Sequence, residues 1–177
     1  MDETRIKQAQ NNFSKYLSEG KIKKIQKFEN IIYETYIRNA RESLNSANQL
    51  FENNTSSLWV VAISYYSMFY MACAYLYKLG YKPGHEIIHQ VVNEALITKG
   101  RNSIKNHILE NYANEKENAL TIVDNHLTNY ENEKTKRASF QYQTTEQIKK
   151  NKSKTSLTRA KEFNELIREI LLFKQKI

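Results

Sequence analysis

The sequence predicts an all-α protein, an up-and-down bundle of four to five main helices preceded by an N-terminal helix. Three observations support this fold class. Glycine and proline, 4 and 1 of 177 residues, are too rare for a chain with many turns. No Asn-Gly or Asp-Gly pair marks a β-hairpin. The stretch Leu58 to Leu79 runs twenty residues before its first charge, Lys78, in a chain that is 26% charged.

The first part of the chain predicts a short helix and a connector. Apolar residues at helical spacing indicate a helix from Asp2 to Leu17, and Ser18-Glu19-Gly20 ends it. The basic run KIKKIQK, residues 21–27, then reads as a solvated connector, with a phosphate-facing patch as the alternative. We therefore expect an N-terminal helix and basic connector over residues 1–27 and one helical bundle over residues 28–177.

The same apolar spacing predicts the helices of the bundle. A turn carrying the single proline, Leu79 to Gly84, separates the second from the third. A polar gap from Ala113 to Asn118 predicts a kink or an exposed turn in the longest helix. Lys134 to Ser156 is polar and Lys-rich, which is typical of a mobile segment. The expected helices are Phe28 to Phe51, Leu58 to Leu79, His85 to Thr98, Ser103 to Lys136 and Leu157 to about Phe173.

The stretch Leu58 to Leu79 is expected to be the buried central helix and not a membrane span. Its length would suffice to cross a bilayer, but Ser64, Ser67 and five tyrosines are spread through it instead of gathering at its ends. Its single cysteine, Cys73, is predicted to be a packed thiol and excludes an internal disulfide. The polar N-terminus carries no secretory or transit signal, so we expect a cytoplasmic protein.

The net charge of +8 is concentrated near the C-terminal third of the chain. Lys134 to Ser156 carries seven Lys or Arg residues against one acid, Glu146. Such an excess permits contact with nucleic acid or another polyanion. A Lys- and Asn-rich composition that reflects genome bias would give the same charge, so both interpretations stay open.

The central stretch also resembles a known family. Ala62-Ile-Ser-Tyr-Tyr-Ser-Met-Phe-Tyr-Met-Ala72 resembles the "A-x-x-x-Y-Y-A-M-F-x-x-A" helix of HEPN domains, named as higher eukaryote and prokaryote nucleotide-binding. Ala40-Arg-Glu-Ser-Leu44 with Ala47 is similar to the family's first helix, "A-R-x-x-L-x-x-A". Further similar positions are Gly80, Pro83 and His85 after the central helix, Arg137 to Tyr142 against "R-x-x-A-D-Y", and Thr145-Glu146 with Ala160 to Phe163 against the closing helix.

This resemblance covers roughly residues 31 to 173 and implies a fold and a set of partners. HEPN domains are four- to five-helix bundles that usually dimerise. Many pair with a minimal nucleotidyltransferase in toxin–antitoxin modules, and others cut RNA in defence systems. In the active members two subunits join their Arg-x(4–6)-His motifs into a metal-independent ribonuclease site. The resemblance therefore implies a homodimer, RNA or nucleotide as ligand, and a nucleotidyltransferase as a candidate protein partner.

Arg137 and Tyr142 form the first candidate site, at the position of the family motif. The arginine is kept, but tyrosine stands where histidine is expected. Because a phenol titrates near 10, Tyr142 is a poor general base at neutral pH, although it can bind phosphate. The pair is interpreted as a phosphate-binding remnant, a modification site or a structural pair. The expected nucleotide- or RNA-binding residues are Arg137, Lys136, Lys149, Lys150, Lys152 and Lys154.

Arg101 and His107 form the second candidate site, because Arg101-Asn-Ser-Ile-Lys-Asn-His107 matches Arg-x5-His literally. RNA cleavage without metal needs a group that takes the 2′-hydroxyl proton and a cation for the developing charge, and these two residue types suit those roles. On one ideal helix their side chains would point about 120° apart. They converge only if a helix begins between them or a second subunit supplies the partner.

No cofactor and no metal site are expected. His85 and His89 have the i, i+4 spacing of metal ligands, but two ligands are too few. Whether the protein is an enzyme stays open at this point. Three functions are compatible with the sequence, namely a binding protein for nucleotide, RNA or a nucleotidyltransferase, an active endoribonuclease, and a purely structural helical adaptor.

Overall fold

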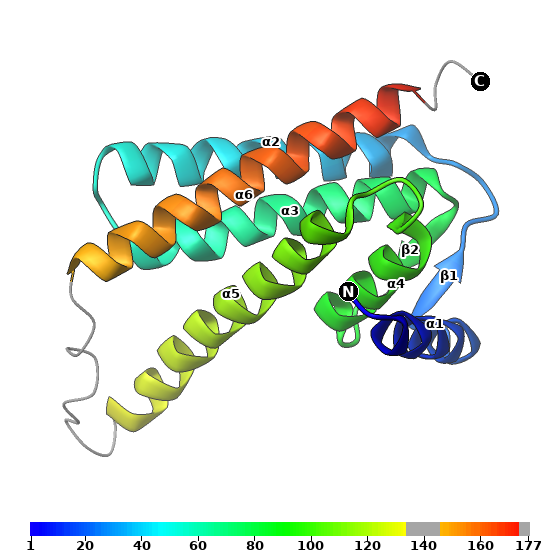
Figure 1. Cartoon of the computed structure of the whole chain (residues 1–177), viewed down its shortest axis with the longest axis horizontal. Coiled ribbons are helices and arrows are strands. Elements are labelled where there is room, and N and C mark those ends of the chain that lie inside the picture. Colours follow the sequence, from blue (N-terminus) through cyan, green and yellow to red (C-terminus); the bar gives the residue numbers. More distant parts are fainter. Residues whose placement is uncertain (134–145, 174–177) are drawn as a thin grey trace.

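The computed structural model of this chain describes residues 1–133 and 146–173, and it confirms the all-α fold class. Within these residues six helices form a bundle with one small pair of strands (Figure 1). The elements are α1 Glu3–Ser18, β1 Ile22–Lys24, α2 Asn30–Glu52, α3 Ser57–Lys78, β2 Tyr81–Pro83, α4 Ile88–Gly100, α5 Asn106–Glu133 and α6 Glu146–Phe173.

The central helix α3 is where sequence predicted it and is covered by its neighbours. The Ser56 side chain caps its N-terminus by accepting a hydrogen bond from the Trp59 amide. Fifteen of its 22 residues are buried, against α2, α4, α5, α6 and β2. By length and composition α3 could cross a membrane, but 67% of its most apolar window is buried within the bundle, as in the core helix of a soluble protein. Cys73 is a packed thiol, and burial raises its pKa.

A buried polar contact holds three helices together at the middle of α3. The Ser67 hydroxyl donates to the Ala40 carbonyl oxygen of α2 at 2.9 Å. It also accepts a hydrogen bond from the Asn164 amide of α6 at 2.9 Å. Because serine and alanine leave little bulk between the helices, α2 and α6 both lie close against α3.

The N-terminal helix α1 is fastened to α4 by an ion pair that sequence did not predict. The Arg5 guanidinium donates two hydrogen bonds, of 2.8 and 2.5 Å, to the Glu94 carboxylate, which is 6% exposed. Burial alone would raise the pKa of Glu94, but its hydrogen bonds, above all those from Arg5, lower that pKa below its usual value, and the carboxylate in turn raises the pKa of Arg5. Phe13 of α1 packs edge-on against Tyr81 of β2, with ring centroids 5.4 Å apart.

The basic run predicted as a connector contains a strand instead. β1 pairs antiparallel with β2, with Ile22 opposite Pro83. Ile22 is buried, whereas Lys23 and Lys24 are exposed. The pairing continues at both ends, because the Ile25 amide donates to the Gly80 carbonyl and the Gly84 amide donates to the Lys21 carbonyl. β1 has only three residues, and β2 lies far along the chain from it. So short a strand shows no pattern in the local sequence, and the pairing could not be predicted from it.

Three of the helices differ from prediction in where they begin or in whether they are continuous. α4 begins at Ile88 and not at His85, because the Gly84 amide is bonded to the Lys21 carbonyl just before β1 and Ile87 takes a left-handed conformation, with φ of 41°. α5 is helical through the polar gap where a kink or an exposed turn was expected, and Glu115 in that gap is 1% exposed. α6 begins at Glu146, eleven residues before the predicted start, so much of the segment expected to be mobile is a helix.

Candidate functional site

The first turns of α6 are docked on α5 by a polar contact. Ser153, Ser156 and Leu157 face the bundle and are buried. The Ser156 hydroxyl donates to the Glu115 carboxylate, and the Arg159 guanidinium donates to the same carboxylate at 2.7 Å. Buried serines thus stand at positions where a helix usually buries apolar residues. For this reason the apolar spacing did not predict the first turns of α6.

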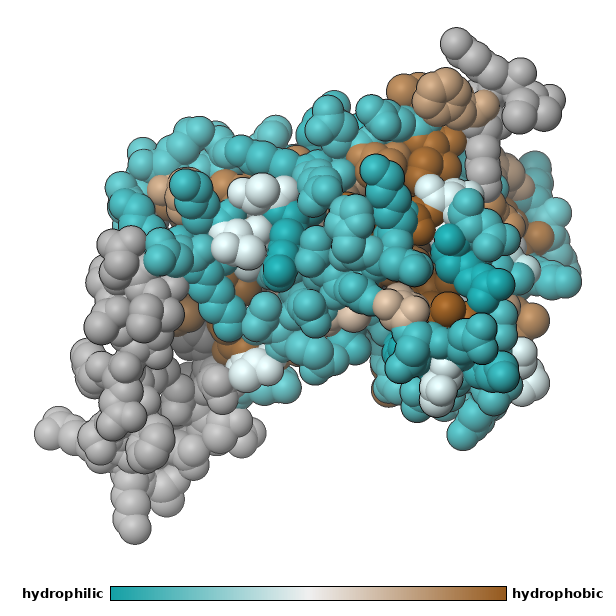
Figure 2. All heavy atoms as spheres, in the orientation of Figure 1, coloured by the Kyte–Doolittle hydropathy of each residue, from teal (hydrophilic) through white to brown (hydrophobic). Residues whose placement is uncertain are grey.

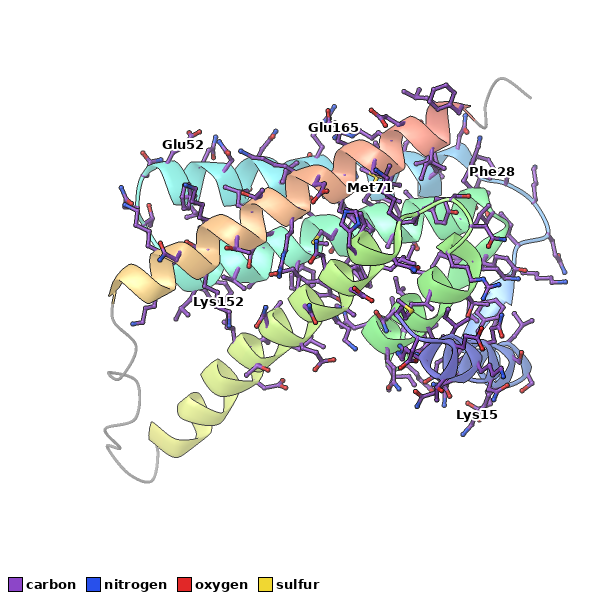
Figure 3. The ribbon with its side chains drawn as sticks, viewed as in Figure 1. Lys15, Phe28, Glu52, Met71, Lys152 and Glu165 are labelled. Carbon is purple, nitrogen blue, oxygen red and sulfur yellow. The ribbon has the colours of Figure 1, made fainter. Side chains whose placement is uncertain are left out.

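This docking displays a row of lysines on the outer surface of α6. Lys150, Lys152 and Lys154 are exposed, and Lys149 is half-buried. Figure 3 shows Lys152 projecting from the end of the bundle where α6 starts. None of the four forms an ion pair with another residue that the structure describes. Lys149 and Lys150 lie about one turn after the first residue of α6, close to the positive end of the helix dipole, and the unpaired positive charges of the row favour an anion.

The surface around these lysines is open. The cavity beside Lys150 and Ser153, which also touches Asn54 in the α2–α3 turn and Ser57 at the start of α3, has a volume of only about 20 Å³. A pocket for a small ligand typically needs about 300 Å³ or more. The lysines therefore suit an extended polyanion better than an enclosed mononucleotide.

A second basic area lies where β1 meets β2. A recess of about 420 Å³ is lined by Lys21, Lys23 and Lys82 and also by Glu19 and Glu86. The Lys21 ammonium lies 2.8 Å from the Glu19 carboxylate. Two acids thus offset much of the positive charge here, whereas no described acid pairs with the lysines of α6.

Arg101 and His107 lie at the junction of α4 and α5. Arg101 is the exposed C-cap residue of α4, and α5 begins at Asn106, so a helix does begin between the two residues. The His107 side chain is 58% exposed, with Nε2 3.5 Å from a carboxylate oxygen of Glu162 on α6. No hydrogen bond or ion pair between Arg101 and His107 is found in the described part of the chain. Histidine is a common general base and arginine binds phosphate, so the two residue types at this junction suit RNA cleavage.

The other predicted site lies outside the described residues. Arg137, Tyr142 and Lys136 belong to the segment 134–145, of which the structure says nothing. In the chain this segment follows α5 directly and leads into the lysines of α6.

His89 has a setting that the sequence did not reveal. Its Nδ1 lies 2.8 Å from the Tyr65 hydroxyl, and its ring packs on Phe69 with centroids 4.6 Å apart. Burial and the nearby Lys116 lower the pKa of His89. Since α4 begins at Ile88, His85 does not share a helix with it, which removes the i, i+4 spacing considered for metal. No group of three or more His, Cys, Asp or Glu that could hold a metal occurs among the described residues.

Comparison with known families identifies this bundle. The family model of the HEPN domain matches residues 33–170, which is more than half of the chain. The chain belongs to the HEPN domain family. Comparisons with curated proteins and with solved structures gave no match. The HEPN match runs from α2 into the last turn of α6 and leaves α1 and β1 outside it. Membership places the chain among helical domains related to nucleotide and RNA.

Proposed function

We propose that this HEPN protein is a cytoplasmic homodimer that binds RNA through the N-terminal part of α6. The observation that carries the proposal is the row Lys149, Lys150, Lys152 and Lys154, which lacks an acidic partner among the described residues. Lys150 and Lys154 are one helical turn apart, and such like charges repel by a few tenths of a kcal/mol. A phosphate backbone beside them relieves that repulsion. Arg137 and Tyr142, just before this helix in sequence, are proposed to extend the same site.

The test is binding of a fluorescein-labelled single-stranded RNA, followed by anisotropy at several salt concentrations. Lys150→Gln/Lys154→Gln should weaken binding and reduce the slope of log K against log salt by about 1.4, at 0.7 for each lost phosphate contact. Lys23→Gln/Lys24→Gln removes the same charge from exposed positions of β1 and should leave binding nearly unchanged. Equal losses in both variants would reject the site on α6.

A wild-type protein that binds neither RNA nor nucleotide would reject the proposal as a whole. Two alternatives from the sequence would then stand, namely a nucleotidyltransferase as binding partner and a structural adaptor. Co-expression with the nucleotidyltransferase of a neighbouring gene, followed by co-purification, separates them.

The second candidate function is a metal-independent endoribonuclease, and the start of α5 between Arg101 and His107 favours it. Because α5 begins at Asn106, Arg101 and His107 do not lie on one continuous helix, which would point their side chains about 120° apart. RNA digestion in the presence of EDTA tests the activity. Cleavage lost in His107→Ala and Arg101→Ala would assign it to this junction, whereas cleavage lost only in Arg137→Ala or Tyr142→Phe would assign it to the segment before α6.

A further inference from the structure

One end of the bundle carries an exposed apolar patch, where α2 begins and α6 ends. Phe28, Ile31, Leu172 and Phe173 are 38% to 71% exposed, although they are large apolar side chains. Figure 2 shows this region as the brown area at the upper right of the molecule, and Figure 3 places Phe28 at the same end. Scattered single apolar residues are normal on a protein surface, but a gathered group marks an interaction site.

The patch contains a groove between α2 and α6. Tyr33 and Ile37 of α2 and Leu171 and Leu172 of α6 line a hollow of about 270 Å³. Glu34 stands on the α2 side of this hollow and Arg168 on the α6 side. Neither charge forms an ion pair with a residue that the structure describes.

We propose that this groove is the surface on which a second copy of the chain docks. α2 and α6 lie side by side and run in opposite directions (Figure 1). A two-fold axis along the groove lays α2 of one copy over α6 of the other. Glu34 then meets the partner's Arg168, and the same pair forms a second time by symmetry. The apolar side chains between these two ion pairs are removed from water.

Self-complementarity favours a second copy over another occupant. The patch offers projecting apolar side chains, Leu172 and Phe173, and also the hollow that such side chains can fill. It offers one acid and one base on opposite sides, which a two-fold axis matches. An RNA backbone would need several cations, but among the residues that the structure describes Arg168 is the one cation that lines the hollow.

The charges further along the two helices repeat this complementarity. A standard interface buries about 800 Å² on each partner, so the contact has to extend beyond the hollow. The next outward residues are Arg38 on α2 and Glu165 on α6, both exposed and opposite in sign. The axis that pairs Glu34 with the partner's Arg168 brings Arg38 toward the partner's Glu165.

This inference deepens the homodimer of the proposed function, and it can fail separately, because its readout is mass and not RNA binding. Sedimentation equilibrium of the whole chain, from about 1 to about 200 µM, covers the weak affinities found for such interfaces. The wild type should reach twice its chain mass of 20.9 kDa. Leu172→Asp should weaken association tenfold or more, whereas Leu58→Asp, an exposed leucine at the opposite end of the bundle, should not.

A mixing experiment tests the predicted pairing directly. Glu34→Arg alone brings two arginines together at each ion pair, and Arg168→Glu alone brings two acids together, so each variant should associate weakly by itself. An equimolar mixture restores opposite charges at both positions and should recover the dimer. A misfolded variant would not be rescued in this way. A monomeric wild type, a dimer that survives Leu172→Asp, or a mixture that stays monomeric would each overturn the proposal.

Discussion

Replacing Glu115 by alanine should destabilise the protein by about 3 kcal/mol. The carboxylate is buried and accepts hydrogen bonds from Ser156 and Arg159. A hydrogen bond to a charged group contributes about 1.5 to 3 kcal/mol, and a buried hydroxyl without its acceptor costs about 1 to 3 kcal/mol. Arg159 is 30% exposed, so without Glu115 its guanidinium can be hydrated by water. The loss of stability should therefore lie near the lower end of the sum of these contributions. In a domain of this size, about 3 kcal/mol lowers the melting temperature by about 6 to 12 °C.

Urea denaturation and thermal melting followed by circular dichroism measure this loss. Glu117→Ala is the matched control, because Glu117 is also on α5 and paired with a lysine but is 72% exposed. Its loss should stay within about 0.5 kcal/mol. Glu115→Ala should also weaken RNA binding, since the start of α6 loses its contact with α5. If the two variants melt alike, Glu115 does not hold α6 in place and the reasoning is wrong.

Three further outcomes follow from the described contacts. The pKa of His89 in the folded protein is lowered by burial and by Lys116, so as the pH falls His89 is protonated in the unfolded chain before it is protonated in the folded one. Stability should therefore fall as the pH drops below about 6.5, and urea melts of His89→Phe should show a shallower fall. Ser67→Ala should cost about 1 to 2 kcal/mol in urea melts, because two buried partners lose a hydrogen bond; a neutral result would contradict this role. Arg5→Ala leaves Glu94 buried and unpaired, and limited proteolysis should cut α1 faster than in the wild type.

The sequence predicted the fold where local periodicity decides it and missed what depends on distant partners. α3 was expected at Leu58 to Leu79 and lies at Ser57–Lys78, because its apolar residues need burial on every side. β1 was missed because its partner lies across two helices. The first turns of α6 were missed because the residues that they bury, Ser153 and Ser156, are small and hydrogen-bonded but not hydrophobic, so they add nothing to an apolar pattern.

The candidate sites show the same division. The lysines of α6 were expected as a basic region, since charge is visible in the composition, but they lie on a helix and not in a mobile segment. Helix geometry predicted that Arg101 and His107 could converge only if a helix begins between them or a second subunit supplies the partner. α5 does begin between them, at Asn106, and the convergence itself stays a prediction. The partner of His107, Glu162, could not be predicted, because the approach of α6 to the start of α5 depends on how the whole bundle packs.

The pairing of β1 with β2 has a consequence for synthesis of the chain. Ile22 can pair only once Pro83 has been synthesised, and Arg5 only once Glu94 has, so α1 and β1 dock only after α4 has left the ribosome. α2 and α3 are neighbours in sequence and need no such delay. Closing the long loop between the strands adds an entropy cost that grows only slowly with its length, by about 0.6 kcal/mol per doubling. During translation the N-terminal helix therefore emerges with its apolar face exposed, while the bundle that will cover it is still being made.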